Sequence, residues 1–339
     1  MEPPQTDSPS ARRIRLAGLG FGLLVLAILI QQTGPARLLR EIHGAGWVLF
    51  PIVTLWGVVY ACNARAWQLL VPARPRSFTF PRAFLLSVNA FALNFATPLL
   101  AMGGEPFRMA GATRYLGRSR AVGSVVSFRF LHALAHVLVF LMAIPAAALL
   151  LPHTLPVLAL LGIAAVILLL IAAFLLSQHR QGVFERAVAL LERTPFLRPL
   201  ALRLERHRPA LQELDQELTA IHREAPWHFR RALGVELAGR LLSTMEYALI
   251  LEALGLTQGI WHGFVIANLS SLVTNLLIFV PFELGTKEGG TYLIFGALGL
   301  DPALGMTAAL LSRVRELSWL AIGLACGWWL DRDARLARA

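Results

Sequence analysis

Cysteine and the sequence motifs of common enzyme classes are scarce in this chain of 339 residues. Its two cysteines, Cys62 and Cys326, both fall in apolar stretches, so neither a disulfide framework nor a C-x-x-C metal site is expected. The sequence also lacks a P-loop, a nucleotide-binding glycine fingerprint and a nucleophile elbow. We therefore expect no cofactor, no metal site and no enzymatic activity.

Charged residues are also scarce, and this scarcity indicates a membrane protein. Only 15% of the residues are charged, 56% are hydrophobic and the mean hydropathy is +0.62. Several apolar runs approach the ~20 residues that a helix needs to span a bilayer. The net charge of +11 is typical of arginine-rich loops on the cytoplasmic side of a membrane, so we predict no nucleic-acid partner. Lys287 is the only lysine, which makes it a candidate for a specific role.

The apolar runs predict an all-α polytopic membrane protein with about eight transmembrane helices and two re-entrant or broken helices. We expect one integral membrane domain over residues 14–330, between a disordered cytosolic tail at 1–13 and a second cytosolic tail at 331–339. The polar stretch at 178–231 is expected to be a cytoplasmic amphipathic insert. The expected transmembrane helices cover residues 14–30, 46–71, 83–97, 122–151, 155–177, 232–254, 261–282 and 303–330.

Two short polar segments interrupt this pattern and resemble each other. The first, TPLLAMGGEPFR, occupies residues 97–108, and the second, VPFELGTKEGG, occupies residues 280–290. In each segment an acid, Glu105 or Glu288, follows a proline by seven positions. Proline removes a helical hydrogen bond, and glycine permits tight turns. We therefore expect helix breaks at Pro98, Gly103, Gly104, Pro281, Gly285, Gly289 and Gly290.

The spacing of the two segments indicates diverged copies of one unit. Arg129 follows the first acid by 24 positions, and Arg313 follows the second by 25. We therefore predict repeat-like halves over about residues 83–151 and 261–330. When the arginine-rich loops are placed inside, the halves have opposite orientations. Inverted repeats whose broken helices meet near the midplane are a recurring transporter architecture, and we expect the two acids to face a shared cavity there.

Charged side chains at membrane depth are costly, which makes them candidates for substrate recognition. The two acids would bind a cationic group, a proton or an opposing arginine, unless they lie in ordinary surface loops. The arginines suit bidentate contacts with phosphate, or they hold helices together through internal ion pairs. The candidate substrate-binding residues are Glu105, Arg108, Arg129, His132, Lys287, Glu288, Arg313 and Glu316.

Two histidines share a helical face with Arg129, yet they do not predict a metal site. His132 and His136 follow Arg129 by three and seven positions. Their i,i+4 spacing would suit zinc, but the sequence HALAH lacks the glutamate of a metalloprotease helix. We interpret the pair as core residues rather than metal ligands.

The order VP-x-ELG-x-KEGG, followed by GALGL and LSRVRE, resembles the transmembrane family of lysylphosphatidylglycerol synthases, also described as flippase-like membrane domains. The stretch NFATPLLAMGGEPFRMAGATRYLG resembles the family's other characteristic segment, and the resemblance covers about residues 14–330. It implies about eight helices and two re-entrant elements that move a lipid headgroup between leaflets. Fused members carry a soluble aminoacyl-transfer domain, which we do not expect here. The family's PG-x-x-G pattern is absent at Pro98 and Pro281, which leaves the substrate open.

These observations predict a flippase-like lipid transporter of the bacterial inner membrane, multi-pass and with both termini cytoplasmic. Its substrate would carry a charged, phosphate-bearing headgroup; the candidates are a phospholipid, a polyprenyl-phosphate lipid and a hopanoid-type lipid. Partners besides the bilayer would be a homo-oligomer or a pathway enzyme. The alternative is a non-transporting membrane subunit that scaffolds a lipid- or glycan-modifying enzyme. For a third class, an intramembrane enzyme, the sequence offers no nucleophile or metal set.

Overall fold

The structure, a computed structural model, is helical in every regular element that it describes. It describes residues 31, 35–71, 74–96, 104–181, 226–277, 280 and 283–336, and no strand occurs among them. The elements are α2 (Pro35–Ala45), the 3-10 helix η1 (Gly46–Val48), α3 (Leu49–Leu69), α4 (Phe80–Ala96), α5 (Gly104–Leu116), α6 (Arg118–Leu150), α7 (Leu155–Gln181), α11 (Pro226–Ala253), α12 (Ile260–Leu276), α13 (Thr286–Ala297) and α14 (Pro302–Leu336). The all-α class expected from the sequence is confirmed.

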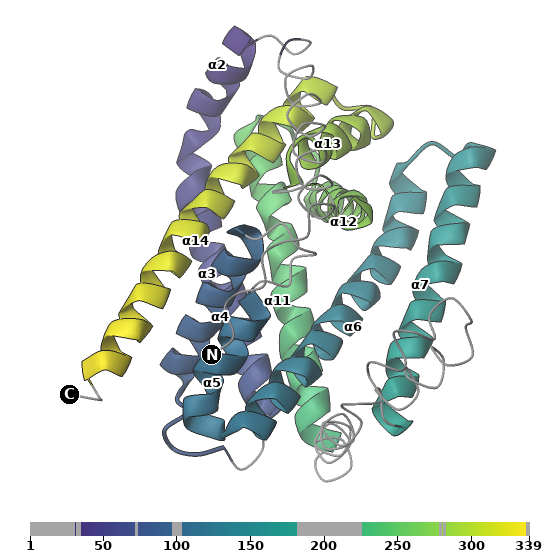
Figure 1. Cartoon of the computed structure of the whole chain (residues 1–339). Helices are drawn as coiled ribbons and strands as arrows, with labels where there is room; N and C mark the ends of the chain where they lie inside the picture. Colours follow the sequence, from purple (N-terminus) through teal and green to yellow (C-terminus); the bar gives the residue numbers. More distant parts are fainter. Residues whose placement is uncertain are drawn as a thin grey trace, which may run out of the picture.

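Three helical stretches among the described residues are long and apolar enough to cross a membrane: Ile42–Leu69, Arg118–Leu150 and Leu155–Ser177. The third belongs to α7, which packs against α6 and lies at one edge of the bundle (Figure 1). Large side chains such as Leu155 and Leu160 are mostly exposed on α7. A helix that is apolar on all sides needs a surrounding apolar phase. The chain is therefore an integral membrane protein, and the number of eight transmembrane helices stays a prediction.

Two pairs of short helices enter the bundle from opposite ends (Figure 1). α4 packs against α5 at the end where α6 begins, which is the lower end in Figure 1, and α12 packs against α13 at the end where α14 begins. These four helices have 17, 13, 17 and 12 residues, or about 18–26 Å of helix length. Each is shorter than the ~30 Å hydrocarbon core of a bilayer, which suits a re-entrant pair.

Each short pair packs against the long helix that follows the other pair. α4 lies along α14, and α12 packs against α6, while α11 packs along α3. The long helices also correspond, with 33 residues in α6 and 35 in α14, and they start at opposite ends of the bundle (Figure 1). The repeat-like halves at about 83–151 and 261–330 remain a prediction, and these matching lengths support it.

The structure differs from the sequence expectations at several helix boundaries. Residues 35–45, which lie outside the expected transmembrane helices, form α2, since arginine, leucine and alanine are all good helix formers. Gly289 and Gly290 do not break a helix, because they lie inside α13. A Cβ atom on Gly290 would lie 3.1 Å from Cγ1 of Val273, so this glycine serves packing against α12. α12 ends before residue 277, and α14 continues into the tail expected at 331–339.

Some expectations fall on residues outside the described ranges. They are the helix-break positions Pro98, Gly103 and Pro281, the tail at 1–13, the helix at 14–30 and residues 182–225 of the insert expected at 178–231. Of the remaining break positions, Gly104 is the first residue of α5 and Gly285 precedes α13.

The contact between α4 and α14 depends on a glycine. A Cβ atom on Gly323 would lie 2.5 Å from Cβ of Ala92 and 2.6 Å from the backbone oxygen of Val88. Asn89 Nδ2 donates a hydrogen bond to the backbone oxygen of Gly323 at 3.0 Å. The two helices can come this close only because glycine has no side chain.

We expect Gly323→Ala to destabilise the protein by about 1–3 kcal/mol, because the added methyl group forces α4 and α14 apart. Gly234→Ala in α11 is the matched control, since a Cβ atom there meets nothing within 4 Å. That change should be neutral or raise stability by up to about 1 kcal/mol. Melting temperatures in detergent measure both effects, and equal values for the two variants would contradict the close approach.

Candidate functional site

Glu288 lies in the first turn of α13, and both of its oxygens are bonded. Oε2 accepts a hydrogen bond from the backbone nitrogen of Gly285 at 2.8 Å, which caps the helix. Oε1 accepts hydrogen bonds from Nη2 and Nε of Arg313 at 2.9 and 3.3 Å. Gly285 makes the turn possible because its φ of +73° lies in the left-handed region. Glu288 is 1% exposed, so this is a fully buried, charge-assisted contact.

Two further residues extend this pair into a network between α13 and α14. Nη1 of Arg313 donates to Oε2 of Glu316 at 3.0 Å. Lys287 Nζ donates to the other carboxylate oxygen of Glu316 and, at 2.6 Å, to Oγ of Ser312. The chain's only lysine is therefore held by a buried carboxylate and a hydroxyl group, and it joins α13 to α14.

Arg315 connects the same network to α3 and α11. Its Nε and Nη2 donate to the two oxygens of Glu246 at 3.2 and 3.1 Å. Its guanidinium carbon lies 3.9 Å from the ring centroid of Trp56, and the indole of Trp56 donates to Glu246 at 2.8 Å. We term the charged residues of this network the C-terminal cluster: Glu246, Lys287, Glu288, Arg313, Arg315 and Glu316.

The C-terminal cluster has no surplus of positive charge. Its three cations face three carboxylates, and each cation donates to at least one of them. Glu283 adds a fourth carboxylate, which interacts electrostatically with Lys287 and Arg313. The three cations and three carboxylates sum to zero charge, and an ionised Glu283 would make the sum negative by one. Such a site has no cation in excess for a phosphate group.

Glu105, in the first turn of α5, is bonded less completely than its counterpart. Its Oε1 accepts a hydrogen bond from Nδ2 of Asn94 at 3.2 Å and lies 3.4 Å from Nη1 of Arg129. Its Oε2 lies 3.8 Å from Nη1 of Arg108 and has no hydrogen-bond partner among the described residues. Asn94 Oδ1 accepts a hydrogen bond from the backbone nitrogen of Gly104 at 2.7 Å. Asn94 therefore caps α5, a role that the acid itself has in α13.

A second buried acid, Glu236 of α11, lies in the same region. Both of its oxygens lie 2.8 Å from Nδ2 of Asn63, and Oε1 lies 2.7 Å from Nδ1 of His132. Nη2 of Arg240 lies 2.9 Å from Nε2 of His132. A guanidinium group can only donate, so Nε2 accepts, Nδ1 carries the proton and the imidazole is neutral. We term these charged and polar residues the N-terminal cluster: Glu105, Arg108, Arg129, His132, Glu236 and Arg240.

The N-terminal cluster has more cations than carboxylates. Three guanidinium groups face two carboxylates, so the described ionisable groups sum to one positive charge. Arg108 is 6% exposed and lies over the rings of Trp67 and Phe128, and its Nε and Nη1 have no hydrogen-bond partner among the described residues. The side chain of Arg129 is 35% exposed. A buried donor without an acceptor is unfavourable, and an anion that reached Arg108 would satisfy these donors.

α11 contributes to both clusters and sets the distance between them. Glu236 and Arg240 belong to the N-terminal cluster, and Glu246 belongs to the C-terminal cluster. The ten positions between the two glutamates correspond to about 15 Å along the helix axis, or half the thickness of a hydrocarbon core. The clusters therefore lie at two depths.

The two repeat acids, Glu105 and Glu288, belong to different charge clusters, and the expected shared cavity near the midplane stays a prediction. Between their clusters lies Tyr60 of α3, which interacts electrostatically with Arg240 on one side and Arg315 on the other. The buried hydroxyl of Tyr60 has no hydrogen-bond partner among the described residues. A buried polar side chain thus lies between the two charge clusters and is within electrostatic range of both.

Each of the eight candidate substrate-binding residues lies in one of the two clusters, four in the N-terminal cluster and four in the C-terminal cluster. Of the partners expected for the two acids, the structure shows opposing arginines: Glu105 pairs with Arg129, and Glu288 pairs with Arg313. The apolar stretch at residues 232–254 contains three ionisable residues, Glu236, Arg240 and Glu246. Because charges at membrane depth are costly, this was the sequence signal that could have revealed further residues of the clusters. The residues that the site prediction missed are Trp56, Asn63, Glu236, Arg240, Glu246 and Arg315.

The histidines have protein partners in the structure. His132 uses both ring nitrogens, one toward Glu236 and one toward Arg240. Its ring lies 4.8 Å from the ring of His136 in an edge-to-face arrangement. Among the described residues, no group of three histidine, cysteine, aspartate or glutamate side chains could hold a metal ion.

We expect strong coupling between Glu288 and Arg313 and weak coupling between Glu105 and Arg129. Breaking a buried pair from one side costs about 3–5 kcal/mol, so Glu288→Gln should lower the melting temperature sharply. Adding Arg313→Gln should then cost far less than it does alone. The partly exposed Arg129 should give a coupling energy below about 1 kcal/mol with Glu105.

The cross pair Glu105→Gln with Arg313→Gln is the control for this double-mutant cycle. The two residues lie in separate clusters, so their effects should add. Melting temperatures of the single and double variants in detergent give all three coupling energies. Additive effects at Glu288 and Arg313, or equal coupling in all three pairs, would contradict the two-cluster arrangement.

Comparison with known proteins gives the family of the chain. The family described as the lysylphosphatidylglycerol synthase TM region matches residues 15–325, a range that contains both clusters. The comparison with curated proteins and the comparison with solved structures each gave no match. Because the family match covers most of the sequence, the chain belongs to the lysylphosphatidylglycerol synthase TM region family.

Proposed function

We propose that this protein moves a lipid with a charged, phosphate-bearing headgroup between the leaflets of the bacterial inner membrane. The observation that carries the proposal is the positive charge of the N-terminal cluster, where one arginine is partly exposed and another has free donors. Membership of a family of membrane domains from lipid-related proteins supports the setting.

Arg108 and Arg129 are the residues that we propose to hold the phosphate. Guanidinium groups bind phosphate through parallel N–H···O bonds. The partly exposed side chain of Arg129 can meet an incoming headgroup, and the free Nε and Nη1 of Arg108 can complete its binding. A phosphodiester with one negative charge would bring the described charges of the cluster to zero.

Glu105 gives this site a counter-charge that can be exchanged. Its carboxylate lies 3.4 Å from Arg129 and 3.8 Å from Arg108. Two anions close to the same cations repel each other, so a bound phosphate must displace the carboxylate or meet it protonated. Because Glu105 lies in the first turn of α5, displacement would move this short helix. Headgroup binding would then be coupled to a movement of the re-entrant pair or to uptake of a proton.

The C-terminal cluster has a structural role in this proposal. Lys287, Arg313 and Glu316, candidates for substrate binding from the sequence, bind one another and Glu288 instead. Their bonds hold α13 against α14. With one end of the molecule held closed by this cluster, the lipid headgroup would reach the N-terminal cluster from the other end.

We propose that this other end, where α4 begins and α14 finishes, faces the cytoplasm. Arginines gather in the segments at this end: Arg74, Arg76, Arg114, Arg118, Arg120 and Arg231. Arginine-rich connections are retained on the cytoplasmic side. This orientation places the C-terminus in the cytoplasm. The sequence predicts the N-terminus on the same side.

The test is movement of a fluorescent phospholipid by purified protein in liposomes. We expect the wild-type protein to move labelled phosphatidylglycerol across the bilayer without a partner protein. Arg129→Gln should slow this movement at least about tenfold, because the loss of a charge-assisted contact of about 1.5–3 kcal/mol corresponds to that factor. Its melting temperature should change little, since the side chain is partly exposed.

Arg118→Gln is the control variant, because this arginine lies on the same helix but is exposed outside the cluster. It should transport at the wild-type rate. Wild-type transport by Arg129→Gln would contradict the assignment of the headgroup site. No movement of lipid by the wild-type protein would contradict transport and favour a scaffolding subunit.

A further inference from the structure

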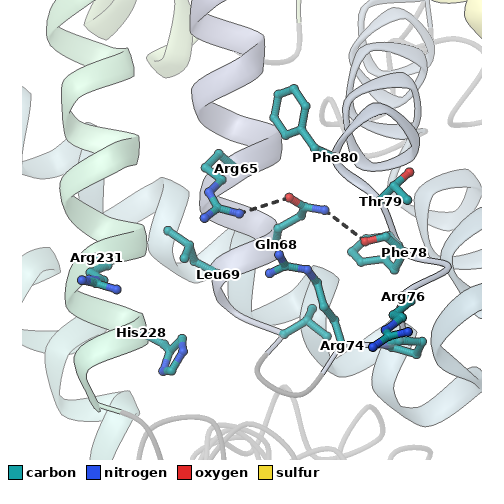
Figure 2. A pocket seen from close by; sticks show the side chains of 12 residues that line it. Arg65, Gln68, Leu69, Arg74, Arg76, Phe78, Thr79, Phe80, His228 and Arg231 are labelled. Carbon is teal, nitrogen blue, oxygen red and sulfur yellow. Dashed lines mark hydrogen bonds between the residues drawn. The ribbon is translucent and has the colours of Figure 1, made fainter.

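A second basic site lies at one end of the bundle, outside both clusters. It is a pocket of about 700 Å³ between the end of α3, the connection to α4 and the start of α11 (Figure 2). Four arginines and one histidine line it: Arg65, Arg74, Arg76, Arg231 and His228. Arg231 and His228 precede the first acid of α11, Glu236, by five and eight positions. The pocket is therefore about 7–12 Å from that acid along the helix.

The positive charge of this pocket is not neutralised from within. No carboxylate is among the described residues that line it. Nη1 of Arg65 lies 3.5 Å from the amide oxygen of Gln68, which is a neutral group. Nε2 of Gln68 donates to the backbone oxygen of Phe78 at 3.1 Å (Figure 2). Nδ1 of His228 is buried and has no hydrogen-bond partner among the described residues. The site thus offers several donors and almost no competing acceptor.

Helix ends strengthen the preference for an anion. α11 has 28 residues and begins at Pro226, so His228 and Arg231 lie in its first two turns. α4 begins at Phe80, which also lines the pocket. The positive dipole ends of α4 and α11 and the negative dipole end of α3 lie at this space, so two positive helix ends outweigh one negative end.

The pocket lies where an apolar span meets water. The span Ile42–Leu69 ends at a residue that lines the pocket. Phe80 is 41% exposed, and Trp227, whose ring lies 4.9 Å from the guanidinium carbon of Arg231, is 56% exposed. Exposed aromatic side chains gather at the interfaces of a membrane. The phosphate groups of membrane lipids lie at this interface. The tails of a lipid whose phosphate groups occupied the pocket would run along the apolar span.

We propose that this pocket binds the headgroup of a membrane lipid that carries two phosphate groups. One phosphodiester would neutralise one arginine of the four, whereas two phosphate groups provide the charge and the oxygen atoms to engage most of them. A volume of about 700 Å³ is ample for such a headgroup. Basic pockets between transmembrane helices are known to bind multiply charged lipid headgroups. The inference does not depend on lipid transport, because no residue of the N-terminal cluster is involved.

Calorimetric titration of the full-length protein in detergent tests this proposal, with farnesyl diphosphate as a short lipid diphosphate. We expect saturable binding of one molecule to the wild-type protein. Farnesyl monophosphate, which has the same tail, and inorganic diphosphate, which has the same phosphate groups, should each bind at least about tenfold more weakly. The triple variant Arg74→Gln, Arg76→Gln, Arg231→Gln should bind farnesyl diphosphate about 100-fold more weakly, or about fivefold for each arginine.

The control is the triple variant Arg114→Gln, Arg118→Gln, Arg120→Gln. These arginines are exposed and lie outside the pocket, and the variant has the same net charge as the test variant. It should bind like the wild-type protein, and an equal loss in both triple variants would overturn the site in favour of general charge attraction. Equal binding of the monophosphate would overturn the requirement for two phosphates. Equal binding of inorganic diphosphate would show a site for a free anion and overturn a lipid ligand.

Discussion

The structure depends on the pairing of charged side chains that are buried within an apolar membrane domain. An isolated charge in such surroundings is costly, so each buried carboxylate must have cations beside it. α11 supplies two of these carboxylates: Glu236 binds Asn63 of α3 and His132 of α6 and lies beside Arg240 of α11 itself. Glu246 binds Trp56 of α3 and Arg315 of α14. The placement of α3, α6 and α14 is therefore tied to the positions of two acids on one helix.

The two acid–arginine pairs differ in how completely they are bonded. Glu288 caps α13, accepts two hydrogen bonds from Arg313 at one oxygen and is 1% exposed. Glu105 leaves one oxygen without a hydrogen bond, and its arginine is 35% exposed. A closed cluster holds helices together, whereas an incompletely bonded cluster can exchange partners. The proposed lipid transport would need both a rigid part and a changeable one, and the two acid–arginine pairs would provide them.

The sequence predicted the apolar helices and the acid–arginine pairs, because hydropathy and spacing report on local structure. α6 and α7 were expected within a few residues of their observed bounds. α2 was missed because its charges interrupt the apolar run. Gly290 was misinterpreted because its packing against α12 is a tertiary contact. The bond between Asn63 and Glu236 joins residues 173 positions apart, and no local pattern in the chain encodes such a distance.

The most direct measurement is an experimental structure of the protein in lipid nanodiscs that contain phosphatidylglycerol. The two-cluster account predicts phosphate density against Arg108 and Arg129, with the carboxylate of Glu105 moved away from them. It also predicts that Arg313 remains bound to Glu288. Phosphate density against Lys287 or Arg313, with the N-terminal cluster unoccupied and Glu105 in place, would contradict the account.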